Sequence, residues 1–77
     1  MSVQIKLFGP LAEVAGKDTV QLPGAADTDS LRRDMLEKYP QLAGLTFVIA
    51  VRKQIVKGNV IISNEDEVAL LPPFAGG

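Results

Sequence analysis

The sequence ends with Glu67-Val68-Ala69-Leu70-Leu71-Pro72-Pro73-Phe74-Ala75-Gly76-Gly77, an apolar run that stops at a double proline and is followed by two final glycines. The run 68–71 places apolar side chains on both faces of a strand, which is typical of a central position in a sheet. Because proline has no backbone N–H to donate, strand pairing must end at Pro72. The sequence therefore predicts a central strand over 67–71 that leads directly into an extended tail, residues 72–77.

Hydrophobic periodicity predicts three more strands and two helices before this last strand. The strands are predicted over 3–7, 19–22 and 47–51, and a short helix is predicted over 11–15. A longer helix of roughly three turns follows three N-cap candidates. These candidates are Asp27, Thr28 and Asp29, and the buried face of the helix is predicted to carry Leu31, Met35, Leu36 and Tyr39. Pro40 is expected to stop this helix, because the residue before a proline disfavours the helical region.

Two turns are predicted in the second half of the chain. Arg52-Lys53-Gln54 is expected to form a three-residue loop into a short strand at Ile55-Val56. No glycine lies in this loop, so its turn type stays open. Ser63-Asn64-Glu65-Asp66 is expected to form a second turn, in which Asn64 tolerates left-handed backbone.

The arrangement of these elements predicts an α+β fold. The first and last strands are rich in apolar residues, so we expect both at the centre of the sheet, as parallel neighbours joined by a right-handed crossover. One main helix would pack against a mixed sheet of about four to five strands. This is the layout of a ubiquitin-like β-grasp domain, which we expect to occupy residues 1–71, with a flexible Gly-Gly tail over 72–77.

Composition limits the class of protein. The chain has 77 residues, enough for one small domain, and a net charge of −1 that argues against a nucleic-acid surface. No apolar run is long enough to span a membrane, so a cytoplasmic protein is expected. The sequence contains no cysteine and no histidine. We therefore expect neither a metal site nor a bound cofactor, and no catalysis by the chain on its own.

The tail is the strongest candidate for a functional site. Residues 72–77 span ~20 Å when extended, at ~3.3 Å per residue, which is enough to reach a buried site in a partner. Gly76 and Gly77 lack Cβ atoms and fit a narrow slot, Ala75 belongs to the inserted segment, and Phe74 is a candidate anchor that sets the register of the inserted tail. The terminal carboxylate of Gly77 becomes reactive once it is adenylated, because AMP is a good leaving group.

Two further groups of residues each allow a functional and a structural interpretation. Phe8, Ile55 and Leu71 are predicted to face away from the core, and together they would form an apolar partner interface at the root of the tail. The alternative is that they belong to the core or lie under a loop. Glu65, Asp66 and Glu67 are interpreted as a solvated turn in preference to an acid–base site, because no basic or metal-binding neighbour accompanies them.

Four stretches resemble the MoaD family, the small subunits of molybdopterin synthase. They are Ile5-Lys6-Leu7-Phe8-Gly9-Pro10-Leu11-Ala12-Glu13, Ala50-Val51-Arg52-Lys53-Gln54-Ile55-Val56, Asp66-Glu67-Val68-Ala69 and Leu70-Leu71-Pro72-Pro73-Phe74-Ala75-Gly76-Gly77. The resemblance covers essentially the whole chain, and the Pro-Pro-x-x-Gly-Gly ending is its most specific part. Related ThiS carriers share the fold and the Gly-Gly end but usually lack the paired prolines. The family often has Asp-Gly-Asp-Glu where this chain has Asn64-Glu65-Asp66-Glu67.

The resemblance implies a β-grasp sulfur carrier. A ubiquitin-activating-type adenylyltransferase would use ATP to adenylate Gly77, and a sulfur donor would convert the adenylate to a thiocarboxylate. The segment from Pro72 and Pro73 through Phe74, Ala75 and Gly76 would insert into the large synthase subunit, which carries the active site. Two small and two large subunits would form a heterotetramer that builds the dithiolene of molybdopterin on a pterin precursor.

Three other hypotheses compete with this one. A carrier of the same fold can serve thiamine synthesis or tRNA thiolation. A ubiquitin-like modifier would instead form isopeptide bonds to lysines through Gly77. A plain binding module would carry a tail without a chemical role.

Overall fold

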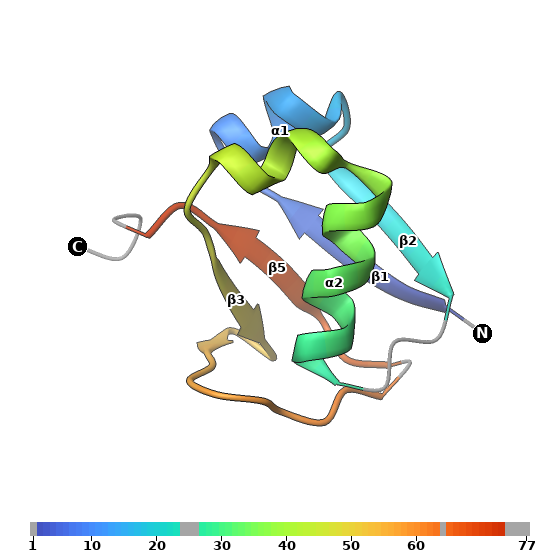
Figure 1. Cartoon of the computed structure of the whole chain (residues 1–77). Helices are drawn as coiled ribbons and strands as arrows, with labels where there is room; N and C mark the ends of the chain where they lie inside the picture. The colour runs from blue at the N-terminus through green and yellow to red at the C-terminus, as the bar shows by residue number, and fades with distance from the viewer. Residues whose placement is uncertain (1, 24–26, 64, 74–77) are drawn as a thin grey trace.

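Five strands form one mixed sheet in the computed structural model, which describes residues 2–23, 27–63 and 65–73 (Figure 1). The strands are β1 (Ser2–Leu7), β2 (Thr19–Pro23), β3 (Val48–Val51), β4 (Gln54–Ile55) and β5 (Val68–Leu71), in the spatial order β2-β1-β5-β3-β4. β1 and β5 are parallel neighbours, with Ile5 opposite Val68, whereas the other pairs are antiparallel. The predicted parallel pair inside the sheet is therefore confirmed.

One main helix covers one face of this sheet (Figure 1). It is α2 (Thr28–Lys38), and it is accompanied by the short helix α1 (Pro10–Ala15) and the 3-10 helix η1 (Pro40–Gly44). The predicted α+β arrangement is confirmed. The main helix ends two residues before Pro40, and this proline begins η1, which the sequence analysis did not predict. A proline suits the first position of a helix because its missing N–H is not needed there.

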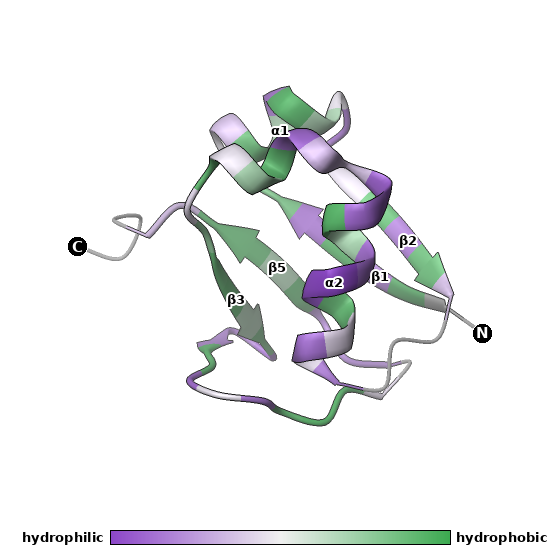
Figure 2. Ribbon diagram, in the orientation of Figure 1, coloured by the Kyte–Doolittle hydropathy of each residue, from purple (hydrophilic) through white to green (hydrophobic). Residues whose placement is uncertain are grey.

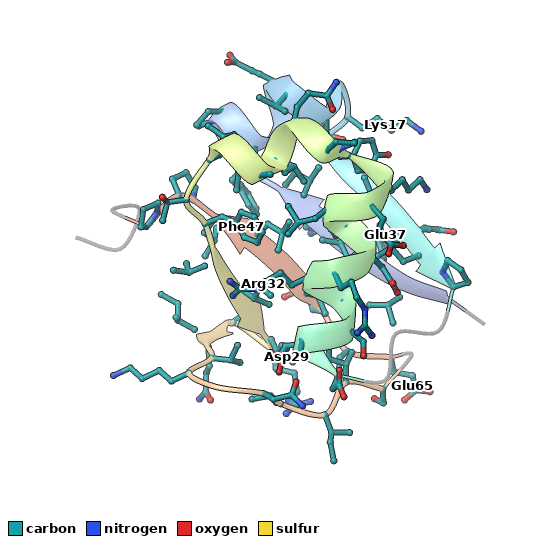
Figure 3. All side chains as sticks on the ribbon, in the orientation of Figure 1. Lys17, Asp29, Arg32, Glu37, Phe47 and Glu65 are labelled. Carbon is teal, nitrogen blue, oxygen red and sulfur yellow. The ribbon has the colours of Figure 1, made fainter. Side chains whose placement is uncertain are left out.

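The core lies between α2 and the sheet. Leu31 and Met35 of α2 are fully buried, as are Ile5 and Val68 of the two central strands. Figure 2 shows the apolar strands behind the mixed surface of α2. Leu36 and Tyr39 pack only partly against this core, so the buried face of the helix is narrower than predicted. Beside α2, on the side of β3, the Arg32 guanidinium lies 5.4 Å from the centroid of the ring of Phe47, which is part of the core (Figure 3).

Polar side chains fasten the start of α2 to the loop that precedes β5. Asp27 is the N-cap, and its Oδ1 accepts a hydrogen bond from Ser30 N at 2.8 Å. Thr28 is only 2% exposed, and its Oγ1 accepts from Val60 N at 2.9 Å. Asn59 Oδ1 accepts from the backbone N–H of the next helical residue at 2.9 Å. Of the three N-cap candidates, only Asp27 caps the helix, while Thr28 reaches across to the loop.

The turn between β3 and β4 differs from the prediction. Ala50 pairs with Ile55 and Val51 with Gln54, so the turn has two residues, Arg52 and Lys53, and not three. Both have positive φ, 52° and 67°, as a type I′ hairpin turn requires. The twist of the flanking strands matches this turn type, and here the twist prevails over the preference of side-chain-bearing residues for negative φ.

Candidate functional site

The predicted residues Phe8, Ile55 and Leu71 lie around one hollow of about 510 Å³ on the outer face of the sheet. We call it the sheet hollow. Its apolar lining is completed by Ala50 and Ala69. This face lies opposite the core, because the exposed side chains of β1 alternate with the buried ones. The three predicted residues therefore come together on one surface.

Two alanines form the floor of the sheet hollow. Strand register places Lys6 opposite Ala69, Ala69 opposite Ala50, and Ala50 opposite Ile55, so these four residues form one row across four strands. Paired residues of neighbouring strands point to the same face of a sheet. The depression forms because the two residues in the middle of the row, Ala69 and Ala50, have small side chains. The longer side chains at the ends of the row, Lys6 and Ile55, form walls.

The apolar walls are open to solvent. Phe8 is 45% exposed and Ile55 is 54% exposed, whereas Leu71 is half-buried. Exposed apolar side chains that gather in one depression are typical of an interaction site. The structure thus brings the predicted interface residues together, and their contact with a partner stays a prediction. Ile61, which is the most exposed large apolar residue among those the structure describes, at 81%, is not part of this lining.

The sheet hollow also has a charged rim that the sequence analysis did not identify. Lys6 of β1, Lys53 of the β3–β4 turn and Glu67 before β5 complete its lining. Lys6 could have been identified from its place between Ile5 and Leu7, because alternation puts it on the face of Phe8. The place of Lys53 depends on the two-residue turn, which the sequence did not reveal.

The tail begins at the edge of this surface. Leu71 lines the sheet hollow, and the next residue, Pro72, lies against Gly9. A Cβ atom at Gly9 would lie 3.3 Å from Pro72 Cγ, and the backbone there has a φ of +59°, so only glycine fits without strain. Pro72 and Pro73 also line a second hollow of about 300 Å³ beside Leu11 and Leu45. The start of the predicted tail is therefore held by contacts with the domain.

The remaining tail residues, Phe74, Ala75, Gly76 and Gly77, lie outside the described residues. Their predicted roles as anchor, slot-fitting segment and acyl carrier stay predictions. The same holds for the proposed left-handed backbone at Asn64.

The acidic group at residues 65–67 belongs to a turn. Asp66 Oδ2 accepts a hydrogen bond from Ser63 N at 2.8 Å, and its Oδ1 forms a salt bridge with Arg52 Nη1 at 2.8 Å. The Ser63 backbone N–H and the Arg52 guanidinium hold the pKa of the Asp66 carboxyl below its usual range. Since both carboxylate oxygens of Asp66 take part in these contacts, the structure favours a turn at residues 65–67, and not an acid–base site.

Acid should weaken the fold in part through Asp66. A carboxyl whose pKa is lower in the folded chain stabilises the fold above its unfolded pKa, and this contribution disappears as the pH falls through the folded pKa, below about pH 4. Asp66→Asn is therefore expected to lower stability at pH 7 and to reduce the further loss between pH 5 and pH 2. Asp27 contributes to the acid loss in the same direction, because its hydrogen bonds with Ser30 also lower its pKa.

Urea unfolding of the parent and of Asp66→Asn at several pH values measures this effect. Asp18→Asn, at an exposed position, serves as the control. Equal urea midpoints for the parent and Asp66→Asn at pH 7 would contradict the assignment.

In the part of the chain that the structure describes, no group of three or more acidic side chains is placed to hold a metal ion. No helix within residues 2–23, 27–63 and 65–73 has the length and apolar character needed to cross a bilayer.

The mixed sheet with parallel β1 and β5, the single main helix, and a last strand that ends at a proline pair define a ubiquitin-like β-grasp protein. Residues 5–77 match the ThiS family. The chain therefore belongs to the ThiS family, and its predicted resemblance to the small subunits of molybdopterin synthase is confirmed at the level of sequence similarity.

Two curated relatives match over all or nearly all of their length. The chain is 34% identical to the molybdopterin synthase sulfur carrier subunit of Caenorhabditis briggsae, covering 100% of this chain and 99% of the relative. It is 35% identical to the subunit of the same name from Dictyostelium discoideum, with 100% of both chains covered.

Solved structures agree on the fold. SAMP1, small archaeal modifier protein 1 of Haloferax volcanii, superposes with a TM-score of 0.80 at 26% identity over 100% of both chains. A chain from the complex of subunits 1 and 2 of the molybdopterin-converting factor of Helicobacter pylori superposes with a TM-score of 0.70 at 26% identity, again over 100% of both chains.

Proposed function

We propose that this chain is the sulfur-carrier subunit of a molybdopterin synthase. The observation that carries the proposal is the position of Leu71. This residue ends the central strand β5 on the wall of the sheet hollow, and the proline pair of the tail follows at once. A partner that covers the sheet hollow therefore lies beside the root of the tail and can take up the residues beyond it. The curated names of the full-length relatives support the same role.

The carrier chemistry takes place at the terminal carboxylate of Gly77. A carboxylate oxygen attacks the α-phosphorus of ATP on an activating enzyme, pyrophosphate leaves, and an acyl-adenylate forms. Sulfide-level sulfur from the donor, as HS⁻, then attacks the carbonyl carbon and AMP leaves, which yields a thiocarboxylate.

The thiocarboxylate sulfur bonds to a carbon of the pterin precursor and displaces a leaving group there, which gives a thioester. Water then attacks the acyl carbon, the bond between this carbon and sulfur breaks, and the carboxylate is restored while the sulfur stays on the pterin. Two such transfers would supply the two sulfurs of the dithiolene.

The partner that receives the tail is a large synthase subunit. The two-subunit complex from Helicobacter pylori, whose small chain has this fold, supports such a partner. Apolar side chains around Ala50 and Ala69 would be covered on binding, and Pro72 and Pro73 would direct the tail into the partner. The active site would lie on the large subunit, and two copies of each subunit would form the working assembly.

Intact mass spectrometry tests the carrier chemistry. The chain is incubated with ATP, a ubiquitin-activating-type adenylyltransferase and a sulfur donor. Replacement of one oxygen by sulfur should add ~16 Da, as expected for an activated acyl group that is captured by sulfur. Omission of ATP should prevent the gain. An unchanged mass with an activating enzyme that modifies another carrier would overturn the proposal.

A ubiquitin-like modifier is the second candidate function. The similarity to small archaeal modifier protein 1, at 26% identity over the whole chain, favours it. In this role the activated carbonyl of Gly77 is attacked by a lysine amine of a target protein, AMP leaves, and an amide bond forms. Conjugates of higher mass that resist reducing agents would identify this activity.

A carrier for thiamine synthesis or tRNA thiolation would instead give the thiocarboxylate without transfer to a pterin.

A further inference from the structure

The β3–β4 turn places two long side chains where glycine or asparagine is usual. Arg52 and Lys53 both have positive φ, 52° and 67°. In this region the Cβ atom of an L-residue crowds the backbone, and two-residue hairpins of this type prefer Asn-Gly. Strained backbone at residues with side chains is a reason to look for a role of those side chains.

The side chain of Arg52 has a role inside the domain. Its guanidinium pairs with Asp66 Oδ1 at 2.8 Å, and its backbone N–H donates to Glu67 O at 2.8 Å. These two contacts join the hairpin to the turn before β5. Arg52 therefore stabilises the position of the hairpin, and the strain at this residue is offset by the contacts that its side chain makes.

The side chain of Lys53 has no such role in the part of the chain that the structure describes. It is exposed and takes part in neither a salt bridge nor a side-chain hydrogen bond there. It does line the sheet hollow, next to the apolar wall that Ile55 forms. Lys53 thus belongs to a surface that a partner would cover.

The charged residues that line the sheet hollow differ in net charge from the chain as a whole. Lys6 lies on the wall across the alanine floor from Lys53, and Glu67 is the one acidic residue in the lining. Two lysines therefore outnumber one glutamate on this surface, whereas the whole chain has a net charge of −1. A complementary partner surface carries an apolar side chain to fill the hollow and a carboxylate to face the rim.

We propose that Lys53 is a specificity-determining residue that pairs with a carboxylate of the large subunit. The proposal rests on the proposed function, because that function supplies the partner. In the complex, an apolar side chain of the large subunit lies over Ala50 and Ala69, and an acidic side chain beside it meets the Lys53 ammonium. The strained position of Lys53 is kept because it presents this charge to the partner.

Lys53→Gly tests the proposal, because it should lower the affinity for the large subunit without lowering the stability of the chain. Glycine adopts positive φ without crowding, so the melting temperature is expected to stay equal or rise. Loss of the ammonium group should weaken binding of the large subunit about fivefold at low ionic strength. A variant that is at least as stable as its parent and binds less well cannot be explained by misfolding.

Two matched substitutions separate charge from backbone geometry. Lys53→Gln removes the charge and keeps a long side chain, so its affinity should fall as in Lys53→Gly. Lys57→Gln makes the same change at an exposed loop position outside the sheet hollow and should leave the affinity unchanged. Titration calorimetry with the large subunit at low salt and at about 1 M salt should show the difference disappear as screening increases.

The outcomes distinguish this proposal from the proposed function. If the parent chain binds the large subunit and both Lys53 variants bind equally well at low salt, the assignment of Lys53 is overturned and the carrier role stands. If the parent chain itself fails to bind a competent large subunit, the proposed function fails. If Lys57→Gln weakens binding as much as Lys53→Gln, the effect belongs to the net charge of the chain, and the specific pair is refuted.

Discussion

A chain that lacks Gly76 and Gly77 should gain no sulfur in the presence of ATP, the activating enzyme and the sulfur donor. The fold should persist, because the described contacts of the tail root end at Pro73, which lines the hollow beside Leu11 and Leu45. A terminal group without glycines carries side chains that a narrow active site excludes. We therefore expect the truncated chain to show no ~16 Da gain, because its terminal carboxylate lies two residues short of the position at which Gly77 would be activated. Its melting temperature should be unchanged.

The control for this experiment is Ile61→Ala, a change at an exposed position away from the sheet hollow and the tail. This variant should gain sulfur like the parent chain. Equal modification of the truncated chain would show that activation does not depend on the Gly-Gly end, and it would contradict the assignment of Gly77 as the acyl carrier.

Ile55→Ala should weaken binding of the large subunit by about threefold to fifteenfold, with little change in stability. Full burial of an isoleucine side chain is worth roughly 1.5–3 kcal/mol, and each step of about 1.4 kcal/mol is tenfold in affinity. The residue is 54% exposed in the free chain, so about half of this burial is gained only on binding. Phe8→Ala and Leu71→Asp should act in the same direction, because these residues form the other walls of the sheet hollow.

Ile61→Ala provides the matched comparison, because it removes the same atoms from a residue that is 81% exposed and outside the sheet hollow. Calorimetric titration should give the parent affinity for Ile61→Ala and a reduced affinity for Ile55→Ala. Equal affinities for the two variants would exclude the sheet hollow as the binding surface for the large subunit.

Local sequence signals were sufficient for both α-helices, for strands β1, β2, β3 and β5, and for the centre of the sheet, but not for the 3-10 helix η1. Strand β5 is apolar on both faces, which is why its central position and its parallel pairing with β1 could be predicted. The outward face of Phe8 and Leu71 followed from the alternation of side chains along strands, whereas that of Ile55 was predicted only from its place after a turn. The centre of the sheet was therefore accessible from periodicity and from the proline pair.

Features that depend on contacts between distant residues were not accessible. The turn at Arg52-Lys53 carries neither glycine nor asparagine, so its two-residue length is set by strand pairing and twist. The hydrogen bond from Val60 N to Thr28 Oγ1 joins residues 32 positions apart, so no local sequence pattern could predict it. The charged rim of the sheet hollow arises from strand register and from this turn together.

Sulfur transfer in a single turnover tests the central claim most directly. The thiocarboxylated chain is mixed with the large subunit and a pterin precursor, and the intact mass of the chain is followed with time. The account predicts that the chain loses ~16 Da and returns to its original mass while the pterin gains sulfur, as hydrolysis of the acyl group requires. A chain that keeps its sulfur in the presence of a competent large subunit and precursor would contradict the account.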